Sequence, residues 1–152
     1  MTAPDHWHPV LCITMLRDSP AGVRLHGQNI VLFRAEHGQI GALPDCCPHR
    51  RMRLSCERVV DHRLQCAYHG WRFDHNGTGE SPGTPKLQVQ LPSYKTRECH
   101  GAVRVKPAGS PATFPSLDIE SYCRMCSLEH EIKAPLERVL NSERIERIYR
   151  GR

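Results

Sequence analysis

The sequence has few aromatic residues and no long apolar run. Aromatic residues make up 6% of its 152 residues, and no stretch approaches the roughly 20 apolar residues that a membrane-spanning helix requires. Residues 1–11 include two His and an Asp where a secretory signal would need a basic end followed by an apolar run. We therefore expect a cytoplasmic protein with no membrane partner.

A strong charge imbalance is also missing. The formal net charge is +5, but the 21 Lys and Arg residues are interspersed with 16 acidic residues. Together with the low aromatic content, this pattern argues against a nucleic-acid partner. The length fits one domain with an ordinary core, which needs neither a metal nor a disulfide for its stability.

Proline, glycine and cysteine are well represented. The 12 Pro and 11 Gly indicate many turns and few long helices, which favours an all-β fold. The eight Cys are better explained as metal ligands or small buried side chains than as disulfides, because cytosolic thiols stay reduced. Their spacing has to decide between these two uses.

A predicted hairpin leads into the first cysteine-containing loop. Residues 30–34 and 39–43 have the composition of two short strands, and the segment 36–38 between them is a turn that contains glycine. The second strand runs directly into Cys46-Cys47-Pro48-His49. A rigid sheet would therefore position this loop.

A second loop resembles the first. It follows residues 63–65 and reads Cys66-Ala67-Tyr68-His69-Gly70, after which residues 71–74 alternate like a strand and end at Asn76-Gly77.

Weaker patterns cover the rest of the chain. We predict strands at 87–91 and 102–105, loops at 79–85 and 107–115, and a short C-terminal helix from residue 134.

The two loops each supply one thiol and one imidazole. Cys47-x-His49 and Cys66-x-x-His69 are separated by 16 residues, and two such pairs can clasp one compact centre. Two Cys and two His would also satisfy a tetrahedral zinc ion, which is the alternative interpretation. Zinc modules commonly group Cys with Cys and His with His, whereas one of each per loop suits a Rieske-type 2Fe-2S cluster, in which one iron has two Cys ligands and the other two His.

Longer stretches around both loops resemble one family. Cys46-Cys47-Pro48-His49-Arg50 and the segment 64–74, LQCAYHGWRFD, look like the Rieske domain of aromatic-ring-hydroxylating and O-demethylating oxygenases. The segments 7–10, 33–34 and 97–101 are also similar to that family, so the resemblance covers about residues 6–108. It implies a Rieske domain over residues 1–115, built as an antiparallel β-sandwich with both cluster loops at one end.

The resemblance also implies which thiols bind the cluster. The family places its ligand one residue before Pro48, so Cys47 is the expected ligand and Cys46 a packed neighbour. Respiratory Rieske proteins carry an extra disulfide between the loops, and its positions are Met52 and Tyr68 here. The chain therefore resembles the oxygenase and ferredoxin branch.

That branch implies a role in electron transfer. The expected partners are a reductase or ferredoxin as donor and an oxygenase catalytic subunit as acceptor. Four arginines beside the first loop either steer an acidic donor or form an ordinary solvated face; they are Arg50, Arg51, Arg53 and Arg58. The runner-up function is a zinc-binding interaction protein that uses the same four side chains.

Residues 116–152 are expected to form an extension. Residues 131–146 resemble the entry to the oxygenase catalytic domain, where the family continues with two His that bind iron. Arg147 and Arg152 occupy that spacing, and arginine has no lone pair to offer a metal. The chain is therefore expected to be an electron-transfer component or a truncated oxygenase large subunit, without oxygenase activity of its own. Cys123, Cys126 and His130 are interpreted as incidental.

Overall fold

The computed structural model describes residues 6–107 and 110–114, and these residues are dominated by strands. The strands are β1 (His8–Cys12), β2 (Ala21–Leu25), β3 (Gln28–Arg34), β4 (Ile40–Pro44), β5 (Arg58–Val60), β6 (Arg63–Gln65), β7 (Arg72–Phe73), β8 (Thr78–Ser81), β9 (Thr84–Gln90), β10 (Lys95–Cys99) and β11 (Ala102–Lys106). Three short 3-10 helices join them: η1 (Ile13–Met15), η2 (Glu36–Gly38) and η3 (Leu54–Cys56). No helix in the described residues is long and apolar enough to cross a membrane. The predicted C-terminal helix, the extension 116–152 and the Cys123-x-x-Cys126 pair lie outside these residues.

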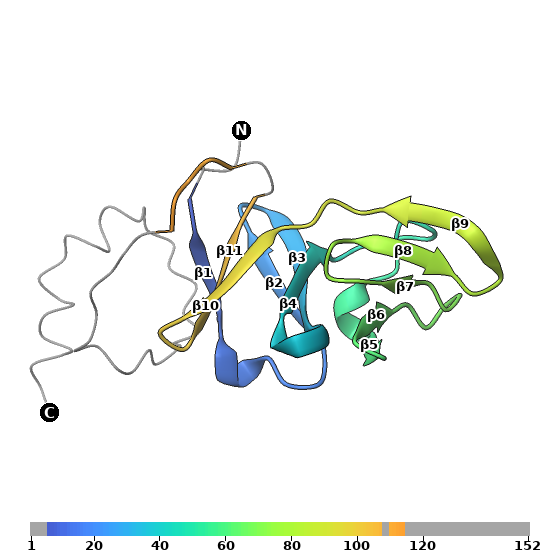
Figure 1. Ribbon diagram of the computed structural model, residues 1–152, viewed down its shortest axis with the longest axis horizontal. Helices are drawn as coiled ribbons and strands as arrows, with labels where there is room; N and C mark the ends of the chain where they lie inside the picture. The colour runs from blue at the N-terminus through green and yellow to red at the C-terminus, as the bar shows by residue number, and fades with distance from the viewer. Residues whose placement is uncertain (1–5, 108–109, 115–152) are drawn as a thin grey trace, which may run out of the picture.

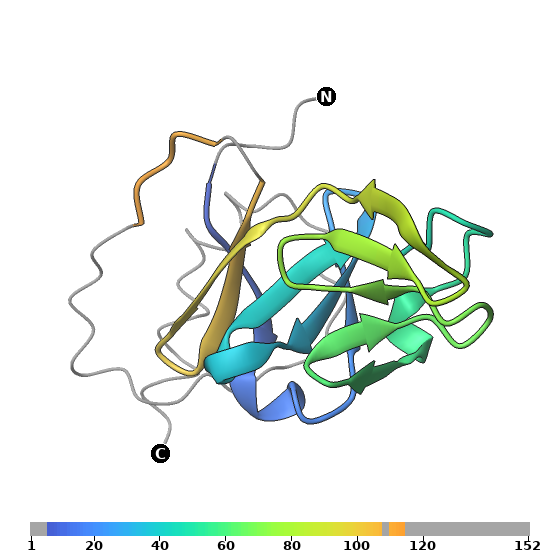
Figure 2. The same cartoon turned by 45° about the vertical axis from the view of Figure 1, so that its right-hand side comes forward.

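The strands form three antiparallel sheets. Their orders are β1-β11-β10, β2-β3-β4 and β5-β6-β7-β8-β9. The sheet β2-β3-β4 lies between the other two, as Figures 1 and 2 show from two directions. The prediction of an all-β antiparallel fold is confirmed.

The middle sheet is buried on both faces because its side chains alternate between two cores. On β3, Ile30 and Leu32 join a core shared with β11, while Val31 and Phe33 join a core shared with the five-stranded sheet. All four side chains have no exposed surface. Each contributes about 1.5–3 kcal/mol by its burial, so β3 holds both halves of the molecule together.

The predicted hairpin before the first loop is confirmed. Strands β3 and β4 pair from Ile30 opposite Pro44 to Arg34 opposite Ile40, with η2 as the turn between them. Two hydrogen bonds join β4 to the sheet β1-β11-β10 and the segment that leads into it. Thr96 Oγ1, on β10, donates to the carbonyl of Ile40 at 2.7 Å, and the amide of Tyr94, just before β10, donates to the carbonyl of Ala42 at 2.9 Å. The end of β4 is therefore a fixed point from which the loop at Cys47 starts.

The predicted loop at 79–85 is wrong over most of its length. Strand β8 covers Thr78–Ser81 and β9 begins at Thr84, three residues before the predicted strand start. Gly79 pairs with Val89, and a Cβ on Gly79 would lie 2.5 Å from the ring of Phe73. The glycine is thus needed for close packing between strands, whereas the sequence rule treats it as a turn residue.

Candidate metal centre

The first loop starts where β4 ends and folds around the backbone of Cys47. The Cys47 amide donates to the carbonyl of Met52, and the Cys47 carbonyl accepts from the amide of Arg51, both at 2.8 Å. Arg51 has a φ of 56°, in the left-handed region that non-glycine residues rarely occupy. These two bonds form a closed backbone frame around the cysteine.

The second loop, between β6 and β7, repeats this frame. The Cys66 amide donates to the carbonyl of Trp71, and the Cys66 carbonyl accepts from the amide of Gly70, again at 2.8 Å. Gly70 has a φ of 72° and stands at the same place in the frame as Arg51. The similarity of the two loops that the sequence suggested therefore extends to their hydrogen bonds.

The four predicted ligand residues come together as two pairs. The Nδ1 atoms of His49 and His69 are 3.0 Å apart, with the ring planes at 75°. The thiol of Cys66 lies close enough to Cys47 to affect its pKa. Both cysteines are 1% exposed, whereas both histidines are exposed. The centre thus has a buried thiol pair and a surface imidazole pair.

Two of these side chains have shifted pKa values, and the shift at the imidazole favours the neutral form that binds a metal. Burial and, to a smaller extent, the neighbouring Cys66 thiol raise the pKa of the Cys47 thiol to about 11. Loss of hydration lowers the pKa of His69 below its usual value, and the Coulombic effects of its neighbours His49 and Arg50 act in the same direction. A neutral imidazole has a lone pair for a metal, and a buried thiol releases its proton when a cation replaces it.

The donor set fits a binuclear cluster better than one metal ion. In residues 6–107 and 110–114, no three His, Cys, Asp or Glu side chains are grouped so that they could hold one ion. A thiol pair beside an imidazole pair matches a Rieske cluster, where each iron takes only two protein ligands. A zinc ion would instead need all four side chains around a single point.

Aromatic side chains line the inner wall of the centre. Trp71 is 5% exposed and stacks on Phe73 with ring centroids 6.2 Å apart, and its ring lies 6.3 Å from that of His49. Both aromatic residues belong to the same core as Cys47 and Cys66. This apolar wall keeps water from the thiol side of the centre.

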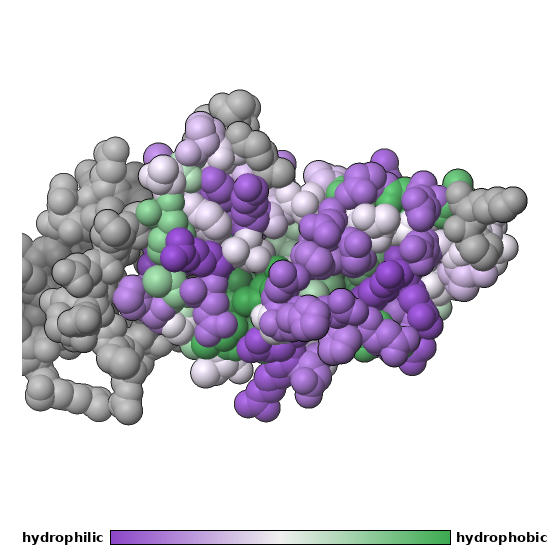
Figure 3. Space-filling view, in the orientation of Figure 1, coloured by the Kyte–Doolittle hydropathy of each residue, from purple (hydrophilic) through white to green (hydrophobic). Residues whose placement is uncertain are grey.

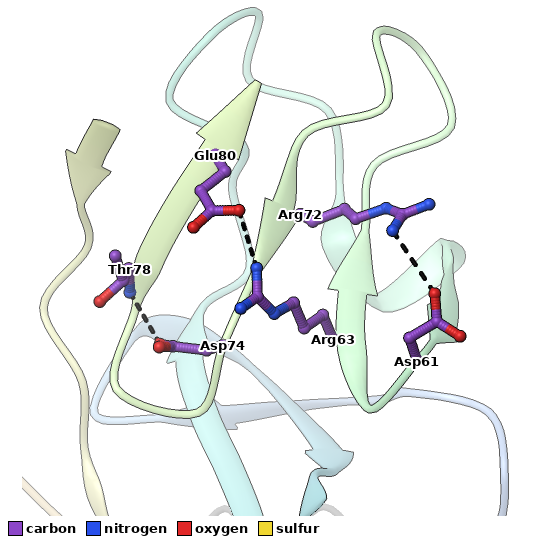
Figure 4. A network of polar contacts seen from close by, with 6 residues as sticks. All are labelled: Asp61, Arg63, Arg72, Asp74, Thr78 and Glu80. Atoms are coloured by element: carbon purple, nitrogen blue, oxygen red, sulfur yellow. Dashed lines mark hydrogen bonds and ion pairs between the residues drawn. The ribbon is translucent and has the colours of Figure 1, made fainter. Parts of the chain in front are cut away.

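The sheet that carries the second loop is cross-linked by polar contacts (Figure 4). Arg63 on β6 pairs with Glu80 on β8 at 2.9 Å, and Arg72 on β7 pairs with Asp61 at 3.5 Å. The amide of Thr78 donates to Asp74 at 2.9 Å and closes the turn that follows β7. Hydrophilic residues also dominate the surface over this sheet in Figure 3. Each exposed pair contributes at most about 1 kcal/mol, so the apolar core remains the main support of the loop.

The side chains that flank the four predicted ligands are half-buried or exposed. The Cys46 thiol is half-buried and points to the carbonyl of Cys47 at 3.9 Å. Met52 and Tyr68, at the positions of the respiratory disulfide, are 42% and 53% exposed. The Arg50 guanidinium lies over the Tyr68 ring at 5.8 Å. An exposed patch of mixed aromatic, apolar and cationic side chains therefore borders the imidazole pair.

Comparison with known proteins identifies the family. The Rieske [2Fe-2S] domain profile matches residues 6–95. Because this match covers more than half of the chain, the chain belongs to the Rieske [2Fe-2S] domain family. The family resemblance inferred from the two loops is confirmed.

Individual relatives agree with this assignment. The phthalate 4,5-dioxygenase oxygenase subunit of Pseudomonas putida is 35% identical over 107 residues, which are 64% of this chain and 24% of that protein. Protein TIC 55 of Pisum sativum, a chloroplastic protein, is 34% identical over 110 residues, which are 66% of this chain and 20% of that protein. The chain thus spans about a quarter or less of these relatives' length.

A solved structure also has the same fold. The crystal structure of dicamba monooxygenase superposes with a TM-score of 0.63 at 28% identity, covering 69% of this chain and 35% of that one. Together, the family and the relatives support a Rieske-type iron–sulfur role in oxygenase systems. They give no support to the zinc alternative.

Proposed function

We propose that Cys47, His49, Cys66 and His69 hold a Rieske 2Fe-2S cluster and that the chain transfers electrons within an oxygenase system. The observation that carries this proposal is the pairing of the four side chains, with the thiols buried together and the imidazole Nδ1 atoms 3.0 Å apart. The cluster would supply one-electron chemistry at a potential of roughly −150 to +300 mV, because two neutral imidazoles replace two anionic thiolates.

The exposed histidine pair is the proposed place where electrons enter and leave. Each imidazole has a second ring nitrogen, Nε2, which is available to a partner protein when Nδ1 faces the metal. Trp71 and the core behind it cover the opposite side of the centre. A donor that approached from the core side would have to cross this packed layer, so the histidine side is the shorter route.

We propose a reductase or ferredoxin as donor and an oxygenase catalytic subunit as acceptor. Several relatives are oxygenase subunits by name, including the phthalate 4,5-dioxygenase and 3-chlorobenzoate-3,4-dioxygenase subunits. An acidic donor would suit Arg50, Arg51, Arg53 and Arg58, all of which are exposed. The cytoplasmic location stays a prediction, and several relatives are named as chloroplastic.

The test is the spectrum of the chain loaded with iron and sulfide. We expect roughly two irons and two sulfides per chain, visible absorption, and a rhombic EPR signal after reduction. A colourless protein that binds one zinc ion in their place would disprove the cluster and support the zinc-binding alternative.

A second measurement concerns oxygenase activity. We expect the loaded 152-residue chain to accept electrons from a reductase or ferredoxin but to hydroxylate nothing by itself, because the positions aligned with the family's iron-binding His are Arg147 and Arg152. Oxygen uptake with an aromatic acid as substrate checks this. Substrate turnover coupled to oxygen uptake by this chain alone would refute the relay role.

A further inference from the structure

Two carboxylates beyond the four predicted ligands connect the two loops, and the sequence patterns did not single them out. The first is Asp45, two residues before Cys47. Its Oδ1 accepts the backbone amide of Ser55 at 2.6 Å, and its Oδ2 accepts the Ser55 hydroxyl at 2.7 Å. Asp45 precedes the first loop and Ser55 follows it. The two bonds therefore close the loop at its base.

The Asp45 carboxylate is buried, so these bonds have to replace its hydration. Its side chain is 2% exposed, and its nearest cationic partner is Arg53, whose Nε lies 3.9 Å away on a side chain that is 66% exposed. A pair this long and this exposed contributes little. The two donors of Ser55 are consequently the main support of the carboxylate, and removing either leaves a buried oxygen without a partner.

The second carboxylate, Glu57, reaches the other loop. Its Oε2 accepts the backbone amide of Ala67 at 2.9 Å, and Ala67 directly follows Cys66. Glu57 is only two residues beyond Ser55. A segment of three residues thus bonds at one end to the residue that opens the first loop and at the other to the second loop.

This connecting segment cannot easily shift as a whole. Leu54, immediately before it, has no exposed surface and belongs to the same core as Cys47 and Cys66. On the outer side, a Cβ on Gly22 of β2 would lie 3.0 Å from the Ser55 side chain. The segment is packed between the core and β2, so it can act as a spacer of fixed length.

We infer that Asp45 and Glu57 are positioning residues that set the separation of the two loops through residues 55–57. Asp45 fixes the position of the loop that carries Cys47 and His49, and Glu57 fixes the position of the loop that carries Cys66 and His69. This inference rests on the proposed function, because its consequence is the strain that a displaced loop would place on a cluster with two ligands in each loop. Asp45 has the larger role, since it is buried and receives two bonds, while Glu57 is half-buried and receives one.

The experiment compares Ser55→Ala, Glu57→Ala and the double variant with wild type, all loaded with cluster. Ser55→Ala removes one donor and leaves every charge in place, so its effect is not electrostatic. The readouts are the rate of iron release to a chelator and the linewidths and g-values of the reduced EPR signal. Asp45→Ala is a fourth variant. Ser19→Ala and Glu36→Ala, both at exposed positions, are the matched controls.

We expect iron release to be several-fold faster in each single variant, because one bond at a loop is lost. It should be about tenfold faster in Asp45→Ala, because both donors of Ser55 then lose their acceptor. The EPR signal should broaden in the same order, while the controls stay within about twofold of wild type. If the segment is a spacer, the logarithmic rate effects of Ser55→Ala and Glu57→Ala are not additive, because either change alone releases it.

Failure of this inference can be told apart from failure of the proposed function. If wild type shows no rhombic signal, the cluster itself is refuted. If wild type is loaded and Ser55→Ala and Glu57→Ala keep its EPR signal and iron-release rate, only the positioning role is refuted, even when their thermal stability falls. Should Asp45→Ala not fold, the other two variants still decide the question.

Discussion

The two loops share one backbone frame but are supported in different ways. In the first, the left-handed position is filled by Arg51, and a buried carboxylate bonded to Ser55 closes the base. In the second, that position is Gly70, and the flanking strands belong to a five-stranded sheet. The first loop depends on the two side-chain bonds at its base, whereas the second depends mainly on its sheet and has one further bond to Glu57. Both loops deliver a buried cysteine.

The histidines differ in their place within this shared frame. His49 follows Cys47 by two residues, whereas His69 follows Cys66 by three, yet their Nδ1 atoms are 3.0 Å apart. The frame therefore fixes the cysteine and lets the histidine come from either of two turn positions. An identical spacing in both loops is not required for the pairs to meet.

The largest predicted effect comes from removing the buried thiol that each loop supplies. Cys47→Ser or Cys66→Ser should abolish cluster assembly, because the thiolate is the ligand of choice for iron in such clusters. Cys46→Ser should leave iron and sulfide near wild-type content, since its half-buried thiol points to a carbonyl oxygen. Iron and sulfide analysis measures this. Equal loss in the Cys46 variant would show that the ligand position is misassigned.

The next largest effect is expected at the residue with left-handed backbone conformation, which is Arg51 in the first loop and Gly70 in the second. Substitutions there should change the stability of the two loops in opposite directions. Gly70→Ala should destabilise the loaded chain by about 2 kcal/mol or more, because the residue has a φ of 72° and its Cβ would lie 2.9 Å from Pro82. Arg51→Gly should instead stabilise by up to about 1 kcal/mol, because it relieves the same strain. Urea unfolding measures both.

Gly27→Ala is the control for this pair. Its φ is 81° but no atom lies within 4 Å of the added Cβ, so it reports the cost of the backbone conformation alone. Equal losses at Gly27 and Gly70 would mean that Pro82 yields and that packing does not constrain the second loop.

The smallest predicted effect is on the rate at which a donor reduces the cluster. The exposed arginines, Arg50, Arg51, Arg53 and Arg58, lie beside the first loop. If they steer an acidic donor, the reduction rate should fall as added salt shortens the Debye length from roughly 30 to 8 Å. Arg50→Gln should lower the low-salt rate several-fold, whereas Arg24→Gln, exposed on β2, should not. Stopped-flow reduction at several ionic strengths measures this. A rate independent of salt would leave the arginines as an ordinary solvated face.

Much of this protein was predictable from its sequence because the informative patterns are local. The proline and glycine content indicated an all-β fold, and the hairpin β3-β4 was predicted within about two residues at each end. The Cys-x-His and Cys-x-x-His spacings, with Pro48 and Trp71 beside them, indicated the family. Residues close together along the chain fix these signals, whatever the rest of the molecule does.

Tertiary structure decided what depends on residues far apart in the sequence. The pairing of Gly79 with Val89 made a strand from a segment rich in glycine and proline, because packing against Phe73 outweighed local preference. The bonds from Asp45 to Ser55 and from Glu57 to Ala67 join residues that no short motif contains. The sequence by itself thus determined which donor atoms are present, and only the folded chain decided that the thiols pair in the core and the imidazoles pair at the surface, because burial is set by the sheets packed around them.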